Sequence, residues 1–166
     1  ADCLETPMEN IVVFSVDTDI SPYDSGSYAS ATTYTTGMAV MKACKELRGK
    51  ICEVGAQMLG TDVDKVAFDG SYVFVDEDEE EEKKVSLEQV ALKGTFFNNI
   101  ELQVVKQHSS PLSPPPFMVG MAEVEVDTET GEVDVLDYVA VVDCGTPINP
   151  NLARVQTEGG IAQGIG

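Results

Sequence analysis

The feature that most constrains this chain is a long helical pattern of apolar residues that extends from Tyr34 to about Leu59. Apolar side chains recur every three or four residues, at Tyr34, Met38, Met41, Cys44, Leu47, Ile51, Val54 and Met58. This spacing puts them on one face of a helix, and that face must pack against other elements. Gly60 is suited to end the helix, and Gly49 marks a candidate break or kink within it.

A polar stretch, Asp17 to Val40, leads into this helix. It begins with turn residues, and from Ser27 to Thr36 almost every side chain is small or hydroxylated. Little bulk would keep a ligand away from the backbone there. The unpaired N–H groups and the dipole of the following helix favour an anion. By itself, however, such a stretch is more often only a helix cap.

Composition narrows the classes of function. A chain of 166 residues fits one domain or two small lobes that share a core. The net charge of -19 argues against nucleic acid and membrane surfaces as partners. A small phosphorylated ligand held by backbone N–H groups stays compatible with it. No apolar run is long enough to span a bilayer, and four scattered cysteines indicate a reducing, cytoplasmic environment. The single His108 offers no metal-ligand cluster.

Several shorter elements are expected in the first two thirds of the chain. Asn10 to Val16 is typical of a buried strand, and Val66 to Val75 of a hairpin that turns at Asp69-Gly70. Ser86 should cap a short helix, with Gln89 completing a capping box and Gly94 closing the helix. Ile100 to Val105 is a candidate strand, followed by a proline-rich loop from His108 to Pro116.

An acidic stretch interrupts this region. Residues 76–82 are seven consecutive carboxylates, followed by Lys83 and Lys84. A like-charged block repels itself, so we expect an exposed loop. A cation site is the alternative, although contiguous carboxylates lack the alternating spacing of an oxygen cage.

The last third contains the clearest β pattern, from Phe117 to Val142. Apolar and acidic residues alternate on both sides of a turn at residues 128–131, which predicts one buried and one wet face. Val139 to Val142 is apolar on both faces, which favours a central strand. Asn149 and Pro150 then begin a helix whose glycines suit close approach of another backbone or a ligand.

Three separated segments carry a resemblance to one family: Asp17 to Ser30, Ala122 to Leu136, and Asp143 to Gly166. In this order and spacing, over nearly the whole chain, they resemble the molybdopterin-binding large subunit of the xanthine dehydrogenase and aldehyde oxidase family. The resemblance implies a molybdenum hydroxylase that oxidises a heterocycle or an aldehyde with oxygen taken from water. The pterin, often in a cytosine dinucleotide form, holds the metal, so no side chain is expected to ligate it. The dinucleotide's pyrophosphate would suit two helix N-termini that face one cavity.

The resemblance also assigns residues to the cofactor. Ala29 and Ser30 match the loop that lies against the molybdopterin beside the metal, and Tyr28 precedes them as in many members. Gln156 matches a family glutamine whose amide contacts the pterin, and an amide can both donate and accept there. The family often has arginine where this chain has Ala31, and an alanine cannot make the contacts of that arginine. We expect Ser30 and Gln156 to point into a common cleft.

Two parts of the family site are not in these residues. A Gly-Gln-Gly segment normally precedes the position of residue 1, and the catalytic glutamate, a general base, normally follows that of Gly166. Glu158 is expected to be an ordinary exposed carboxylate. We therefore expect a fragment, inactive in isolation, that works with the rest of its subunit and with iron–sulfur and flavin (FAD) domains or subunits. The intact enzyme is expected to be a multimer that acts on a small molecule.

The fold expected from this resemblance is α+β, a two-lobed fragment of the molybdenum-cofactor-binding domain. It would have mostly antiparallel sheets, one long helix and a Gly-rich C-terminal helix. Approximate lobes are residues 1–75 and 86–166, joined by the acidic loop 76–84. One alternative is a non-catalytic interaction or assembly module that keeps the fold. Another is a nucleotide-binding domain of a different lineage, although the usual phosphate-binding glycine motifs are absent from the sequence.

Overall fold

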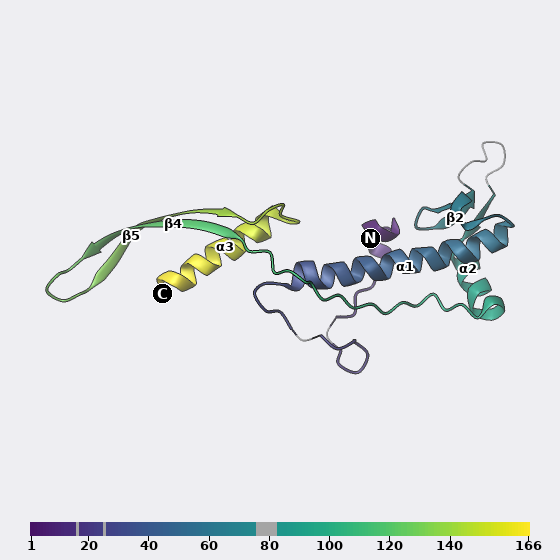
Figure 1. The fold of residues 1–166 in the computed structure, drawn as a ribbon, viewed down its shortest axis with the longest axis horizontal. Coiled ribbons are helices and arrows are strands. Elements are labelled where there is room, and N and C mark those ends of the chain that lie inside the picture. The colour runs from purple at the N-terminus through teal and green to yellow at the C-terminus, as the bar shows by residue number, and fades with distance from the viewer. Residues whose placement is uncertain (16, 25, 76–82) are drawn as a thin grey trace. The chain divides into compact units, whose positions relative to one another are not determined.

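The computed structural model describes residues 1–15, 17–24, 26–75 and 83–166 (Figure 1). It divides into an N-terminal unit, Ala1–Pro111, and a C-terminal unit, Leu112–Gly166. The division falls after Pro111 rather than at the acidic stretch, because strands on the two sides of that stretch pair with each other. The exposed loop and the cation site considered for residues 76–82 lie outside the described residues. None of the helices in the described ranges is both long and apolar enough to cross a membrane.

The predicted long helix is confirmed as α1, Thr32–Leu59, and it runs through Gly49 without a break. It ends where Gly60 adopts a left-handed conformation, with φ 70°, and donates its N–H to the carbonyl of Ala56. Glycine tolerates this conformation because it has no Cβ to clash. The helix therefore begins and ends close to where its apolar spacing and its terminal glycine indicated.

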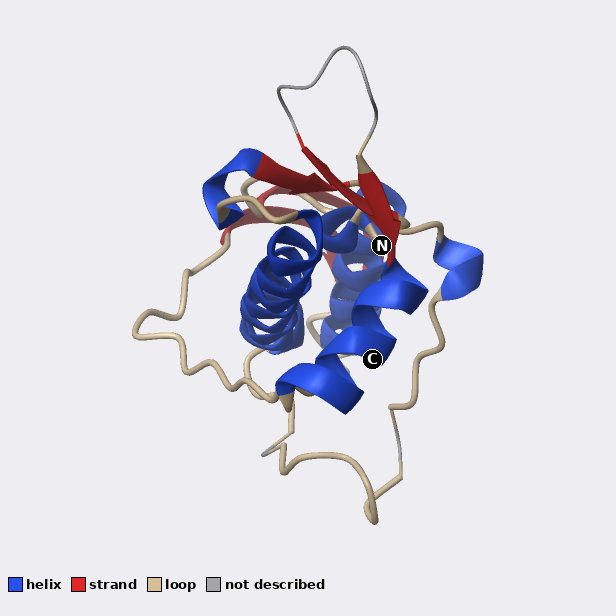
Figure 2. Ribbon diagram, turned by 90° about the vertical axis from the view of Figure 1, so that its right-hand side faces the viewer, coloured by secondary structure: helices blue, strands red, loops and turns tan. Residues whose placement is uncertain are grey.

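Three short strands form an antiparallel sheet in the order β1-β2-β3: Val66–Phe68, Tyr72–Val75 and Lys84–Ser86. The hairpin predicted for the first two is confirmed. Figure 2 shows these strands against one side of the helices of this unit. The core between sheet and helices consists of five buried apolar side chains: Ile51, Val54, Phe68, Val73 and Val90.

The helix α2, Leu87–Lys93, begins at the predicted capping box. The Ser86 hydroxyl accepts from the Gln89 N–H at 3.2 Å, and the Gln89 side chain accepts from the Ser86 N–H at 2.9 Å. The prediction that the helix ends at Gly94 is wrong. The helical backbone continues beyond α2 as a π-helical turn, Gly94–Asn98. The chain reverses at Asn99, whose φ of 52° supplies the left-handed residue expected at a helix end.

Two predicted strands are wrong. Residues 10–15 form no strand, and Val12 and Phe14 are 80% and 74% exposed. Ile100 to Val105 is not a strand either, although it runs along α1. Apolar runs predict burial, but a strand also needs a neighbour with free backbone groups. Neither segment has such a neighbour among the described residues.

The C-terminal unit contains the predicted hairpin, β4 Phe117–Val126 and β5 Val133–Asp143, and the helix α3, Pro150–Ile165. The Asn149 side chain caps α3 by accepting from the Leu152 N–H at 3.1 Å. The predicted burial is wrong, however. Both strands are mostly exposed, and within the described residues β5 pairs with β4 alone, so Val139 to Val142 is not in a central strand.

Candidate functional site

A tight turn precedes α1 at the three residues assigned to the cofactor loop. The Ala31 N–H donates to the Tyr28 carbonyl at 3.1 Å, which closes a four-residue turn. Its two central residues, Ala29 and Ser30, have φ angles of 50° and 57°. Two consecutive left-handed residues define a type I′ turn, which normally carries Asn-Gly. Holding non-glycine residues there costs roughly 1–2 kcal/mol per residue.

The first turn of α1 has N–H groups that no capping side chain uses. Ala31 occupies the N-cap position and has no acceptor in its side chain. The N–H groups of the following residues, Thr32 and Thr33, therefore remain available to a ligand or to water. Tyr28, Ala29 and Ser30 are all exposed. The turn thus presents a hydroxyl, a phenol and helix-terminal donors on an accessible surface.

Gln156 lies on α3, in the C-terminal unit, and it too is exposed. The structure brings Tyr28, Ala29 and Ser30 together in one turn of the N-terminal unit, whereas Gln156 belongs to the other unit. The common cleft expected for Ser30 and Gln156 stays a prediction.

The glycines of α3 have no packing reason within the described residues. A Cβ added at Gly159, Gly160 or Gly164 would meet nothing within 4 Å. Glycine weakens a helix by about 1 kcal/mol relative to alanine, so its use here is unfavourable for the helix alone. Close packing inside this unit therefore does not explain the Gly-rich sequence. The prediction that a ligand or another backbone approaches these glycines stays open.

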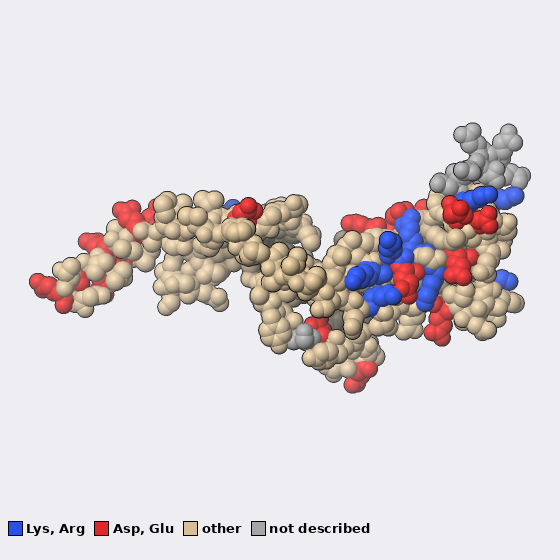
Figure 3. All heavy atoms as spheres, in the orientation of Figure 1, with Lys and Arg blue, Asp and Glu red and all other residues tan. Residues whose placement is uncertain are grey.

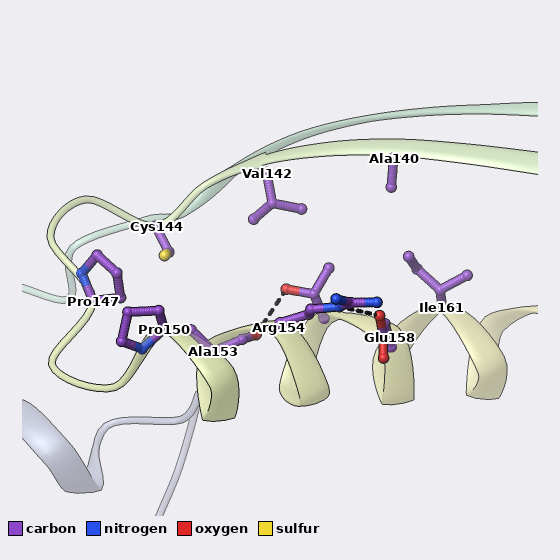
Figure 4. A pocket seen from close by; sticks show the side chains of 10 residues that line it. Ala140, Val142, Cys144, Pro147, Pro150, Ala153, Arg154, Glu158 and Ile161 are labelled. Carbon is purple, nitrogen blue, oxygen red and sulfur yellow. Dashed lines mark hydrogen bonds and ion pairs between the residues drawn. The ribbon is translucent and has the colours of Figure 1, made fainter.

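A cleft of about 430 Å³ lies between β5 and α3 of the C-terminal unit (Figure 4). Its walls are mainly apolar, with Val142 on the strand and Ile161 on the helix, and the Cys144 thiol lies at one end. The sequence did not predict this cleft, because its walls belong to different elements and the packing of a strand against a helix has no local sequence signal. The cleft does not include Gln156 among its lining residues.

Two of the residues that line this cleft form an ion pair on the surface of α3. The Arg154 guanidinium donates to the Glu158 carboxylate at 2.6 Å, one turn further along α3. The hydrogen bond with Glu158 raises the pKa of Arg154. Both side chains are exposed. Glu158 is therefore an exposed carboxylate, as the sequence predicted.

Comparison with known proteins adds the identity of the domain. Residues 1–166 match the family described as the molybdopterin cofactor-binding domain. The chain belongs to this family. The resemblance seen in the three sequence segments is thereby confirmed.

Relatives of this molybdopterin cofactor-binding domain are parts of much longer proteins. The probable hypoxanthine oxidase XdhD of Escherichia coli K12 is 37% identical over 169 residues, covering 100% of this chain and 17% of that protein. The carbon monoxide dehydrogenase large chain of Hydrogenophaga pseudoflava is 29% identical, covering 97% of this chain and 20% of that protein. The chain thus spans about a fifth of the relatives' length, and the relatives carry the names of oxidoreductases.

Solved structures agree on the fold. Carbon monoxide dehydrogenase from Oligotropha carboxidovorans matches with a TM-score of 0.62 and 28% identity, over 86% of this chain and 18% of that one. Quinoline 2-oxidoreductase from Pseudomonas putida 86 matches with a TM-score of 0.63 over 98% of this chain and 21% of that one. At 24% identity, the second match supports the fold alone. The expected α+β class, with antiparallel sheets, one long helix and a Gly-rich C-terminal helix, is confirmed.

Proposed function

We propose that this chain forms part of the molybdopterin site of a molybdenum hydroxylase that oxidises a heterocycle or an aldehyde with water-derived oxygen. The observation that carries the proposal is the strained turn at Ala29 and Ser30, directly before α1, in a chain whose whole length matches the cofactor-binding family. Non-glycine residues held in left-handed conformations are concentrated at ligand sites. The turn coincides with the residues that the resemblance assigned to the cofactor.

The residues present fit a pterin in their chemistry. The Ser30 hydroxyl and the Gln156 amide each donate and accept, as the mixed edge of a pterin requires. The uncapped N–H groups at the start of α1 suit the anionic oxygens of a phosphate or a pyrophosphate. The bound cofactor would supply the molybdenum and the oxidation chemistry. The chain's own residues would hold and orient it.

The proposed enzyme is larger than this chain. The relatives include a large subunit of nicotine 6-hydroxylase and subunit gamma of a dehydrogenase complex, so related domains work within multi-subunit proteins. We propose partners of the same kind here: the rest of the subunit, and domains or subunits that carry iron–sulfur centres and FAD, in the cytoplasm. The base glutamate is expected outside residues 1–166, so this chain alone is expected to have no turnover.

The experiment uses the protein that carries this chain, expressed together with molybdenum cofactor synthesis and purified. Molybdenum is measured by mass spectrometry, and the pterin by fluorescence after oxidation. About one molybdenum per chain is expected, with several-fold less in Ser30→Ala and Gln156→Ala. The exposed Ser109→Ala and Gln107→Ala are matched controls that should keep it.

Two results would reject the proposal. One is a folded wild-type protein without molybdenum under conditions that load a relative such as carbon monoxide dehydrogenase. That outcome would favour the non-catalytic interaction module instead. The other is equal molybdenum content in the two site variants and their controls, which would reject the residue assignments.

A further inference from the structure

A segment of residues 98–108 begins at the end of the π-helical turn and then runs along α1 within the N-terminal unit, in the direction opposite to the helix (Figure 1). We call this segment the strap. Four contacts join α1 to it in turn: Gln57 to Asn98, Lys50 to the Gln103 carbonyl, Glu46 to Lys106, and Lys42 to His108. The α1 positions are seven, four and four residues apart, so they share one face of the helix.

Side chains of α1 hold the strap because the backbone groups of a helix interior are already paired within the helix. Its two ends are held differently. Near its start, Ile100 and Leu102 pack against the hydrophobic core. Its far end depends on two polar contacts, the Lys106–Glu46 ion pair and the hydrogen bond between Lys42 and His108. The far end is therefore the part that can open without disturbing the core.

The Lys42–His108 contact, which we call the latch, has a defined protonation requirement. The Lys42 Nζ lies 2.9 Å from the His108 Nδ1. A lysine ammonium can only donate, so Nδ1 must accept, and the imidazole must be neutral with its proton on Nε2. Protonating His108 replaces this hydrogen bond with two cations in contact. Two unit charges 2.9 Å apart in water repel each other enough to shift the equilibrium between closed and open strap by up to about tenfold.

Other charges on the facing elements do not compensate for that second cation. On α1 they are Lys45, Glu46, Lys50 and Glu53, and on the strap they are Glu101 and Lys106. The carboxylate nearest the latch along α1, Glu46, already pairs with Lys106, and this hydrogen bond lowers the pKa of Glu46. Figure 3 shows several basic side chains gathered on this unit beside acidic ones. His108 is also the only histidine of the chain.

We propose that the latch is a proton-sensitive switch: protonation of His108 frees the far end of the strap from α1. The closed state requires a neutral imidazole, so the latch is lost when His108 takes up a proton. Residues 109–116 follow the strap and lead directly into β4.

The first test is backbone NMR relaxation of the full chain at pH 7.5 and 5.5. The order parameters of residues 103–108 should fall below about 0.6 at the lower pH, whereas those of α2 should not respond. In His108→Gln, the amide oxygen can still accept from Lys42 but does not titrate, so the response should disappear. An unchanged response in this variant, or none in the wild type, would overturn the proposal.

The second test does not depend on how a histidine variant folds. Nitrogen NMR of His108 at pH 7.5 should show the tautomer with its proton on Nε2. In Lys42→Met, the tautomers should become mixed, and the order parameters of residues 103–108 should be lower at both pH values. A wild-type spectrum with the proton on Nδ1 would contradict the latch directly.

Discussion

Gly55 of α1 lies so close to Val73 of β2 that a Cβ at position 55 would sit 2.5 Å from the Val73 Cγ1. Helix and sheet are in contact at this point, and both residues are buried. The close approach depends on the missing side chain. It brings the apolar face of α1 into the core of the N-terminal unit.

Gly55→Ala should therefore destabilise the chain by about 1–3 kcal/mol, because the added methyl overpacks the core. Urea denaturation measures the change. Gly49→Ala is the matched control: it lies in the same helix, is exposed, and has nothing within 4 Å of an added Cβ. It should stabilise by about 0.5–1 kcal/mol through helix propensity. Equal effects of the two substitutions would mean that α1 and β2 are not in this contact.

Ala29→Gly should stabilise the chain by about 0.5–1 kcal/mol, because glycine removes the cost of a left-handed alanine at φ 50°. The gain is reduced by the larger backbone freedom of glycine in the unfolded state. Ala39→Gly, inside α1, is the control and should destabilise by about 1 kcal/mol. Thermal unfolding distinguishes them, and a loss of stability in both would argue against the type I′ turn.

Arg48→Met should loosen the N-terminal segment. The Arg48 guanidinium donates to the Glu5 carboxylate at 2.8 Å and to the Phe68 carbonyl at 2.7 Å. Losing both should cost about 1–3 kcal/mol. Arg154→Met, which breaks only an exposed pair on α3, should have a much smaller effect. Limited proteolysis before residue 11 should accelerate in the first variant and not in the second.

Cys52 should react more slowly with a thiol reagent than Cys3 or Cys144. Burial raises the pKa of the Cys52 thiol, and the nearby Arg48 only partly opposes this. Cys3 and Cys144 are exposed. At pH 8 a smaller fraction of Cys52 is thiolate, and the reactive form is the thiolate. Mass spectrometry after brief alkylation should find Cys52 the least modified of the three, and comparable labelling would contradict its burial.

Acid should weaken the β1–β2 turn through Asp69. The Tyr72 and Ser71 N–H groups donate to this carboxylate at 2.7 and 2.9 Å, and these bonds lower its pKa. Because the pKa is lowered in the folded state, the ionised Asp69 contributes to the free energy of unfolding above about pH 4. This contribution is lost as pH falls further. Asp69→Asn should be less stable at pH 7 and should show a smaller decrease between pH 5 and 3. An identical acid profile would exclude this role.

Local signals in the sequence predicted local structure well. The apolar spacing of α1, the capping box at Ser86 and the cap at Asn149 each depend on neighbouring residues, and each was found. The errors at residues 10–15 and Ile100 to Val105 have one cause. Periodicity predicts that a segment is apolar, but the availability of a strand partner depends on residues far away in the sequence.

The candidate site shows the same contrast between local features, which the sequence predicts, and contacts between distant residues, which it does not. The hydroxyl-rich turn was visible because its residues are contiguous, although its left-handed conformation at Ala29 and Ser30 was not. The cleft beside α3 could not be predicted, since its walls come from a strand and a helix. The Arg154–Glu158 pair alone had a readable signal, the four-residue spacing that joins side chains on one helix face.

The pairing of β2 with β3 has a practical consequence. The Val75 N–H donates to the Lys83 carbonyl at 3.4 Å, so the two sides of the acidic stretch are tied together by the ladder itself. Extra residues inserted between these anchors would cost only a slowly growing closure entropy. This position is therefore suited to accept an epitope or a fluorescent reporter while the remainder of the domain folds as before.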